Sequence, residues 1–294
     1  MTTYTTYNQV GKAEDVSDII TDITPTDTPM STLMKSEKTH ARVFEWQEDS
    51  LANAAVNAAV EGADASMATL SPTTMRSNVT QILTKAFQIS ATADAIKTYG
   101  RAKETAYQMG KALKEIKRDQ ERAFVGVSQA AVTGTASAAR KMASIDQQIT
   151  NSTVAGSSAT DPLTEAKLLV AGQDAFEKGS DPSVLMVKPA DGLVIAGFTA
   201  SAGRNREFAS TKTLVNVIDL YVGPFGSYKV VLNRHQLTTH AFLIDPSMFK
   251  QVVLRPYTRT LLAKNGDSDR HQIVAEISCK HSSFADSHMI TGLS

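Results

Sequence analysis

Residues 92–124 read TADAIKTYGRAKETAYQMGKALKEIKRDQERAF, and this segment constrains the fold more than any other. Its apolar residues recur at steps of three and four positions, with charged residues between them. The pattern predicts one amphipathic helix of roughly 30 residues, which corresponds to a rod of about 45–50 Å. Thr92 is the expected N-cap. A helix of that length needs a long partner surface, so the rest of the chain must supply one.

The polar side of this predicted helix is rich in basic residues. Lys111 and Glu115 are four positions apart, as are Lys117 and Glu121, which predicts ion pairs along the helix. A solvated helix face is one reading of the basic residues, and no aromatic side chain lies among them to stack on bases. The other reading makes them contacts for nucleic acid, and the residues concerned are Lys111, Lys114, Lys117, Arg118 and Arg122.

Two extended segments precede the helix. Residues 39–47 alternate polar and apolar side chains, and residues 78–90 also favour a strand. Between them, residues 51–77 are rich in Ala, Ser and Thr and hold almost no large side chain that could form a core. So long a segment without a core means either that these strands are assigned wrongly or that the segment is a functional projection.

The remainder of the chain predicts a mixture of helices and short strands. Residues 126–160 read as a loop region, and Asp161-Pro162 predicts the start of a helix that Gly179 ends. Strands are expected at 183–187, 214–221, 228–233 and 241–245, followed by a returning pair at 248–262 and 271–280. The fold class is therefore α+β.

The charges balance overall but are distributed unevenly. The chain holds 30 Lys/Arg and 30 Asp/Glu, so no global field attracts it to nucleic acid or to an anionic membrane. Residues 1–75 hold 4 Lys/Arg and 11 Asp/Glu, which leaves 26 and 19 for the remainder. Chance clustering on a solvated surface is one explanation. The other is that the acidic front contacts the basic part of a neighbouring copy.

Motifs that carry chemistry are missing from the sequence. It has no Gly-x-Ser-x-Gly nucleophile motif and no phosphate-binding loop, and its histidines lack the paired spacing of zinc sites. The single cysteine, Cys279, excludes an intrachain disulfide, and we expect it to be buried or unpaired. There is no secretory signal and no apolar run of about 18 residues. The sequence predicts no enzyme, no metal, no cofactor and no membrane contact.

Several motifs resemble the tailed-bacteriophage major capsid protein family, whose architecture is also called the Johnson fold. At the front these are DVSDIITDITPTDTP (residues 15–29) and FEWQEDSLA (residues 44–52), of which Thr-Pro followed by Glu-Trp is the most distinctive. The resemblance continues to the C-terminal part through NVTQI (78–82), ISAT (89–92), EIKRDQE (115–121), LRP (254–256), LAKNGD (262–267) and VAE (274–276).

The resemblance implies a shell subunit with five parts. These are an N-terminal arm (1–38), an extended two-stranded loop (39–90), a peripheral domain with a long spine helix (91–160), a mixed α/β axial domain (161–245) and returning strands of the peripheral domain (246–294). The extended loop would reach across a neighbour, because small side chains can bury surface on an adjacent copy. Its candidate intersubunit contacts are Trp46, Asp49, Leu51, Glu61, Leu70 and Arg76.

The same resemblance implies partners and a location. The subunit would form hexamers and pentamers of an icosahedral virion shell, assembled in the host cytoplasm, with a portal and with packaged double-stranded DNA held by nonspecific contact. Only 38 residues precede the first loop strand, so a separate scaffolding protein is expected. An encapsulin-like cellular compartment is the alternative, since it would share the fold.

The lysine positions add one expectation. No lysine lies between Lys38 and Lys85, so the extended loop cannot form an isopeptide cross-link through a lysine side chain.

Overall fold

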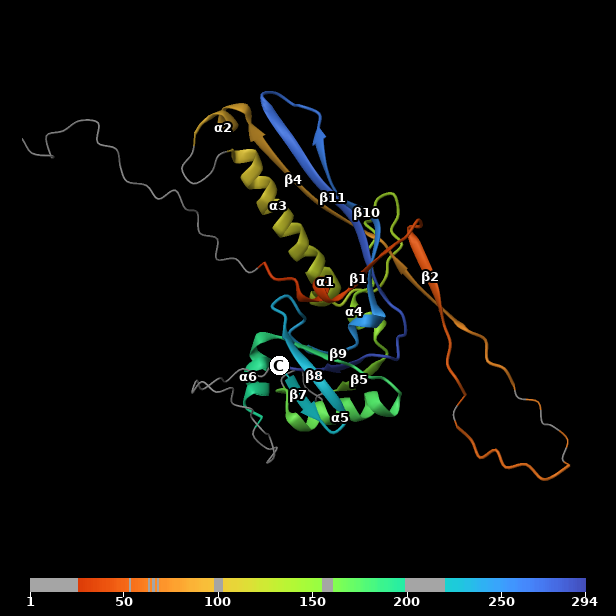
Figure 1. The fold of residues 1–294 in the computed structure, drawn as a ribbon. Coiled ribbons are helices and arrows are strands. Elements are labelled where there is room, and N and C mark those ends of the chain that lie inside the picture. The colour runs from red at the N-terminus through yellow and green to blue at the C-terminus, as the bar shows by residue number, and fades with distance from the viewer. Residues whose placement is uncertain are drawn as a thin grey trace, which may run out of the picture.

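The computed structural model describes residues 26–52, 54–62, 64, 67, 69–97, 103–154, 161–198 and 220–294. Within them the chain is mixed α/β with few helices, as the sequence predicts. Three sheets are present in these residues: one of four strands, one of six and one of two (Figure 1). Residues 1–25 of the expected N-terminal arm and most of the strand expected at 214–221 lie outside the described residues.

The four-stranded sheet forms the upper part of the molecule in Figure 1. Its order is β1 (Lys35–Lys38), β10 (Phe249–Leu262), β11 (Ser268–His281) and β4 (Gln81–Ser90). β1 runs parallel to β10, and the other pairs are antiparallel. Helix α3 (Glu104–Glu121) lies along one face, where its Ile116 packs with Leu83 and Ile273. The long helix thus has the long partner surface that its length requires.

The helix is shorter at its start than the sequence predicts. Ser90, not Thr92, caps a separate helix α2 (Ala91–Ala95), and the chain is extended at Ile96. Asp94 then caps the start of α3, since its carboxylate accepts hydrogen bonds from the Thr105 amide (3.0 Å) and hydroxyl (2.8 Å). The prediction of a single helix over residues 92–124 is therefore wrong. At its other end α3 continues into a π-helical turn, η2 (Arg122–Gly126).

The six-stranded sheet forms the lower part of the molecule. Its order is β5 (Asn151–Val154), β12 (His288–Thr291), β9 (His240–Ile244), β6 (Val184–Val187), β8 (Gly226–Leu232) and β7 (Leu220–Gly223). Helices α5 (Glu165–Glu177) and α6 (Pro189–Ala196) pack against it. α5 begins after the Asp161-Pro162 start that the sequence predicts, because the Thr164 hydroxyl is the N-cap and accepts from the Lys167 amide.

Two strands of this sheet come from outside the range expected for the axial domain. β12 lies between β5 and β9, parallel to the first and antiparallel to the second. β5 precedes residue 161 and β12 follows residue 245, so the sheet includes parts of the ranges expected for the peripheral domain. Pairing between segments so distant in sequence leaves no local signal in the sequence. The range expected for the axial domain (161–245) therefore does not include every strand of the six-stranded sheet.

The third sheet is a hairpin base. β2 (Val43–Glu48) pairs antiparallel with β3 (Thr74–Val79), in register from Val43 opposite Val79 to Glu48 opposite Thr74. The chain between these strands, residues 49–73, has no strand or helix at any described position, and every described side chain in it is exposed. In Figure 1 it projects far from the body. The projection expected from the sequence is thus present, and we call residues 49–73 the projecting hairpin.

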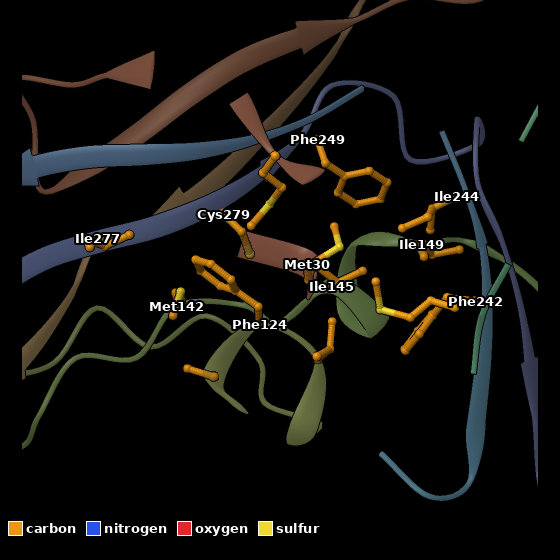
Figure 2. Close-up of a cluster of buried hydrophobic side chains, with 14 of the residues drawn as sticks. Met30, Phe124, Met142, Ile145, Ile149, Phe242, Ile244, Phe249, Ile277 and Cys279 are labelled. Atoms are coloured by element: carbon orange, nitrogen blue, oxygen red, sulfur yellow. The ribbon is translucent and has the colours of Figure 1, made fainter. Parts of the chain in front are cut away.

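One buried cluster joins the two large sheets. Short elements contribute to it: Met30 of α1 (Pro29–Leu33), Ile145 of α4 (Ile145–Gln148), and Phe249, which follows η3 (Pro246–Met248). Figure 2 shows these side chains converging with Phe124 and Cys279. Cys279 is buried and unpaired, as expected, and burial raises the pKa of its thiol to about 12.

Candidate assembly surfaces

The projecting hairpin is held at its base by aromatic packing. Trp46 is only 8% exposed, and its ring lies 5.7 Å from that of Phe44 and 6.0 Å from that of Phe284. The Lys280 ammonium lies 5.7 Å from the Trp46 ring centroid. Trp46 therefore packs within its own chain, where it fixes the hairpin base against the segment that follows β11.

Ionic contacts reinforce this base. The Arg76 guanidinium donates to Glu48 at 2.7 Å and lies 4.5 Å above the Phe284 ring. Glu48 also accepts from the Phe284 amide at 2.8 Å and from the Ser283 hydroxyl at 3.2 Å. Burial opposes ionisation, but Arg76 and the two further donors outweigh it, so the pKa of Glu48 lies below its ordinary value. Arg76 is thus engaged within its own chain, like Trp46.

Beyond the base, the projecting hairpin exposes apolar side chains. Five large ones, between 81% and 98% exposed, are Leu51, Val56, Val60, Met67 and Leu70. Of the six residues expected to contact a neighbour, Asp49, Leu51, Glu61 and Leu70 are exposed here, and Trp46 and Arg76 are at the base. From Val43 to Met75 the sequence holds five carboxylates and no Lys or Arg. The hairpin is therefore an acidic projection with an apolar surface that its own chain does not cover.

The second candidate surface is the basic side of α3. Lys111, Lys114, Lys117 and Arg122 are exposed, and Arg118 is half-buried. Two acidic residues of the helix, Glu115 and Asp119, pair with Lys85 of β4, at 3.5 and 3.4 Å. The prediction from the i,i+4 spacing, that Lys111 pairs with Glu115 and Lys117 with Glu121, is therefore wrong. Among the described residues none of the five basic side chains has a carboxylate partner, and we call these five residues the positive stripe.

Glu121 is the residue that sequence reasoning missed. Solvent does not reach it, and its carboxylate accepts from the amides of Met30 (2.8 Å) and Ser31 (2.9 Å), from the Ser31 hydroxyl and from the Asn233 side chain (2.7 Å). Both amides belong to the first turn of α1, so Glu121 acts as a distant N-cap for that helix. A glutamate at the end of an amphipathic helix gives no sequence signal for such a role.

The histidines do not form a metal site in the described part of the chain, where no group of three or more His, Cys, Asp or Glu side chains could hold an ion. His281 stacks on Phe249 at 4.1 Å between ring centroids, and His288 lies 2.7 Å from the Thr153 hydroxyl. Burial lowers the pKa of each imidazole to about 4. Among the described residues, no helix is long and apolar enough to cross a membrane.

Comparison with known proteins decides the family. A family model described as SU10 major capsid protein matches residues 1–294. The chain belongs to this family. The major capsid protein of Escherichia phage Phieco32 is 30% identical to this capsid protein over an alignment of 330 positions. The alignment covers 95% of this chain and 94% of the relative. The family implied by the sequence motifs is confirmed, and the protein is a structural subunit of a phage virion.

Solved shells share the fold of this capsid protein at low identity. The capsid of a native GTA particle superposes with a TM-score of 0.71 at 9% identity, covering 98% of both chains. A chain from Microbacterium phage Oxtober96 gives 0.68 at 13%, covering 96% of each. The SrpI encapsulin of Synechococcus elongatus PCC 7942 gives 0.56 at 7%, covering 96% of this chain and 92% of that one. The encapsulin alternative thus rests on a common fold, whereas the phage family matches the whole chain.

Proposed function

We propose that this capsid protein assembles as hexamers and pentamers into a closed icosahedral shell around double-stranded DNA, in the host cytoplasm and with a portal at one position. In this shell α3 is the spine helix of the peripheral domain, residues 26–38 belong to an N-terminal arm, and the six-stranded sheet is the core of the axial domain. The projecting hairpin contacts an adjacent copy and holds neighbours together.

The observation that carries this proposal is the exposure of the hairpin. Its five large apolar side chains contribute nothing to a core, although contiguous apolar surface is rarely left open to water on a monomer. The base, by contrast, is fixed by Trp46, Arg76 and Glu48. A projection that is fixed at its base and apolar beyond it suits a contact with a second molecule.

Deletion of residues 52–71, with a short Gly-Ser connection that preserves β2–β3 pairing, tests this role. We expect the shortened subunit to stay folded, because every described side chain in the removed segment is exposed, and to lose the ability to form closed shells in electron micrographs. A matched control replaces the same residues with a Gly-Ser segment of equal length, and it should fail in the same way. Intact shells of normal size from either variant would contradict the proposal.

The positive stripe on α3 is proposed to contact a separate scaffolding protein during assembly and DNA after packaging. Its support is the absence of carboxylate partners for the stripe among the described residues, which leaves the charges available to an acidic partner. The double variant Lys114→Glu and Lys117→Glu should lower the amount of scaffold in assembled particles, measured by gel densitometry. Lys229→Glu, an exposed lysine on β8, is the control. Unchanged scaffold content in the double variant would remove the stripe as the docking surface.

A further inference from the structure

The chain enters α1 at one end of the positive stripe. The Glu121 carboxylate accepts the amides of Met30 and Ser31, so α1 lies over the last turn of α3, as Figure 1 shows. Lys114 and Lys117 precede Glu121 by seven and four positions, and at about 3.6 residues per turn these positions share one face of the helix. The residues before α1 therefore start next to the stripe, on the same side of α3.

The stripe sets the chemistry of a molecule that can cover it. Its five side chains are positive, and among the described residues none of them contacts a carboxylate. Leu113, four positions before Lys117 and therefore adjacent to it on the helix, is 37% exposed. The aliphatic stems of the lysines add apolar surface. A segment that matches this side of α3 is acidic on one face and apolar on the next.

Residues 13–25 of the same chain have this pattern. They read AEDVSDIITDITP and hold four carboxylates and no Lys or Arg. Apolar residues recur at positions 16, 19, 20 and 23, which is the spacing of one helix face. Asp15, Asp18 and Asp22 follow the spacing of a second face. The chain thus carries, directly before α1, an acidic segment with the two faces that the stripe requires.

We propose that residues 14–23 dock on the positive stripe of their own chain and run in the same direction as α3. The spacings of the charges coincide. The three aspartates are three and then four positions apart, and three charges of the stripe follow the same steps. The facing pairs are Asp15 with Lys111, Asp18 with Lys114, and Asp22 with Arg118.

Charge and chain length both support this direction. In the opposite direction Asp22 beside Lys111 would bring Asp18 next to Glu115, so that like charges would meet. In the proposed direction six residues connect Asp22 to Pro29, the first residue of α1. They have to span little, because Arg118 precedes Glu121 by three positions, or about 4.5 Å along the helix. The connection includes Thr24-Pro25, where proline disfavours a continuing helix and allows the chain to turn into α1.

This contact lies within one chain, so it forms in the unassembled subunit and does not depend on the proposed shell. Its consequence rests on the proposed function. A stripe covered by the arm cannot bind a scaffolding protein or DNA, so the arm must leave before either of them binds. Exposed ion pairs are individually weak, which permits this exchange. Unchanged scaffold content in the Lys114 and Lys117 double variant would remove the consequence and leave the contact standing.

Cysteine cross-linking of the dilute, unassembled subunit tests the contact and its direction. We expect Asp18→Cys with Lys114→Cys to be linked within one chain by a short bismaleimide, as shown by mass spectrometry of peptides from the monomer band. The matched control, Asp22→Cys with Lys111→Cys, places the thiols about 10 Å apart along the helix and should give a several-fold lower yield. The native Cys279 is buried and does not compete. Equal yields from the two pairs, or a linked dimer in place of the linked monomer, would contradict the proposal.

Neutralising the arm gives a second measurement on the same subunit. We expect the triple variant to bind labelled heparin about tenfold more tightly, because the loss of three weak ion pairs uncovers the stripe. Its substitutions are Asp15→Asn, Asp18→Asn and Asp22→Asn. The control removes the same charge from the projecting hairpin, where the substitutions are Asp49→Asn, Glu61→Gln and Asp64→Asn, and it should change the affinity much less. An equal gain in both variants would show that net charge, and not a docked arm, controls access to the stripe.

Discussion

The buried Glu121 carboxylate illustrates at the residue scale how one side chain joins three parts of the chain. Replacing it with alanine leaves donors on Met30, Ser31 and Asn233 without an acceptor in a site that water does not enter. Because each unsatisfied donor costs about 1–3 kcal/mol, we expect Glu121→Ala to lower the free energy of unfolding by roughly 3–5 kcal/mol. Urea denaturation of the unassembled subunit measures this.

The control for Glu121 lies on the same helix. Glu115→Ala removes one of two partially exposed carboxylates that pair with Lys85, and Asp119 remains as its partner. Exposed pairs of this kind contribute about 0–1 kcal/mol, so the control should unfold close to the native midpoint. Equal destabilisation by both substitutions would show that Glu121 is not a special acceptor.

His281 and His288 make stability depend on pH. Their pKa is about 4 in the folded chain and about 6.5 when unfolded, so between these values the unfolded state binds more protons. The contribution of these histidines to the free energy of unfolding therefore has its full value above pH 6.5. It decreases as the pH falls from 6.5 to about 4, by about 1.4 kcal/mol per pH unit for each histidine. Asp286, whose pKa burial raises, acts in the opposite direction.

Urea unfolding of the subunit at pH 7 and pH 5 should show this loss. In His288→Gln the dependence on pH should be weaker than in the native subunit but not abolished, since His281 and His240, whose pKa burial also lowers, still titrate in this way. A subunit equally stable at both pH values would contradict the assignment.

At the scale of elements, the β2–β3 hairpin base depends on a single aromatic anchor. A two-stranded sheet is marginal by itself, and this one is supported by Trp46 against Phe44 and Phe284. Truncation of a buried tryptophan typically costs about 3–5 kcal/mol. We expect Trp46→Ala to open the base, seen as fast amide exchange over β2 and β3 while β11 stays protected. Trp46→Phe should retain most of the protection, and unchanged exchange in Trp46→Ala would show that the anchor is dispensable.

Elements with local signals could be predicted from the sequence, and elements without them could not. Periodicity located the part of α3 around Ile116, and small side chains identified the projecting hairpin. The break before α3 was missed, because the apolar spacing continues past Ile96 and the Asp94–Thr105 contact, which stabilises the new helix start, joins residues 11 positions apart. For the candidate site, exposure of Leu51 and Leu70 followed from composition, whereas the inward packing of Trp46 depends on Phe284, more than two hundred residues away.

At the scale of the whole molecule, the composition of the projecting hairpin excludes one kind of covalent bond between neighbouring subunits, the isopeptide bond from a lysine of the hairpin. The projecting hairpin holds no lysine, and guanidinium groups are poor nucleophiles because they stay protonated. Mature shells boiled in denaturant should therefore run as one band near 31.6 kDa. Shells treated with a bifunctional amine reagent provide the positive control for a ladder. A ladder in untreated shells would show that another residue forms a covalent bond between subunits.

The place of β12 in the six-stranded sheet has a consequence for biosynthesis. β5 (Asn151–Val154) is translated close to the middle of the chain, yet its neighbour β12 (His288–Thr291) emerges almost last, and β1 likewise waits for β10. A nascent chain on the ribosome therefore holds unpaired strand edges until translation is nearly complete, and contacts this distant in sequence also slow folding. A polypeptide that stops before His288 lacks the strand that joins β5 to β9, so we expect a prematurely terminated subunit to be degraded and not to be incorporated into shells.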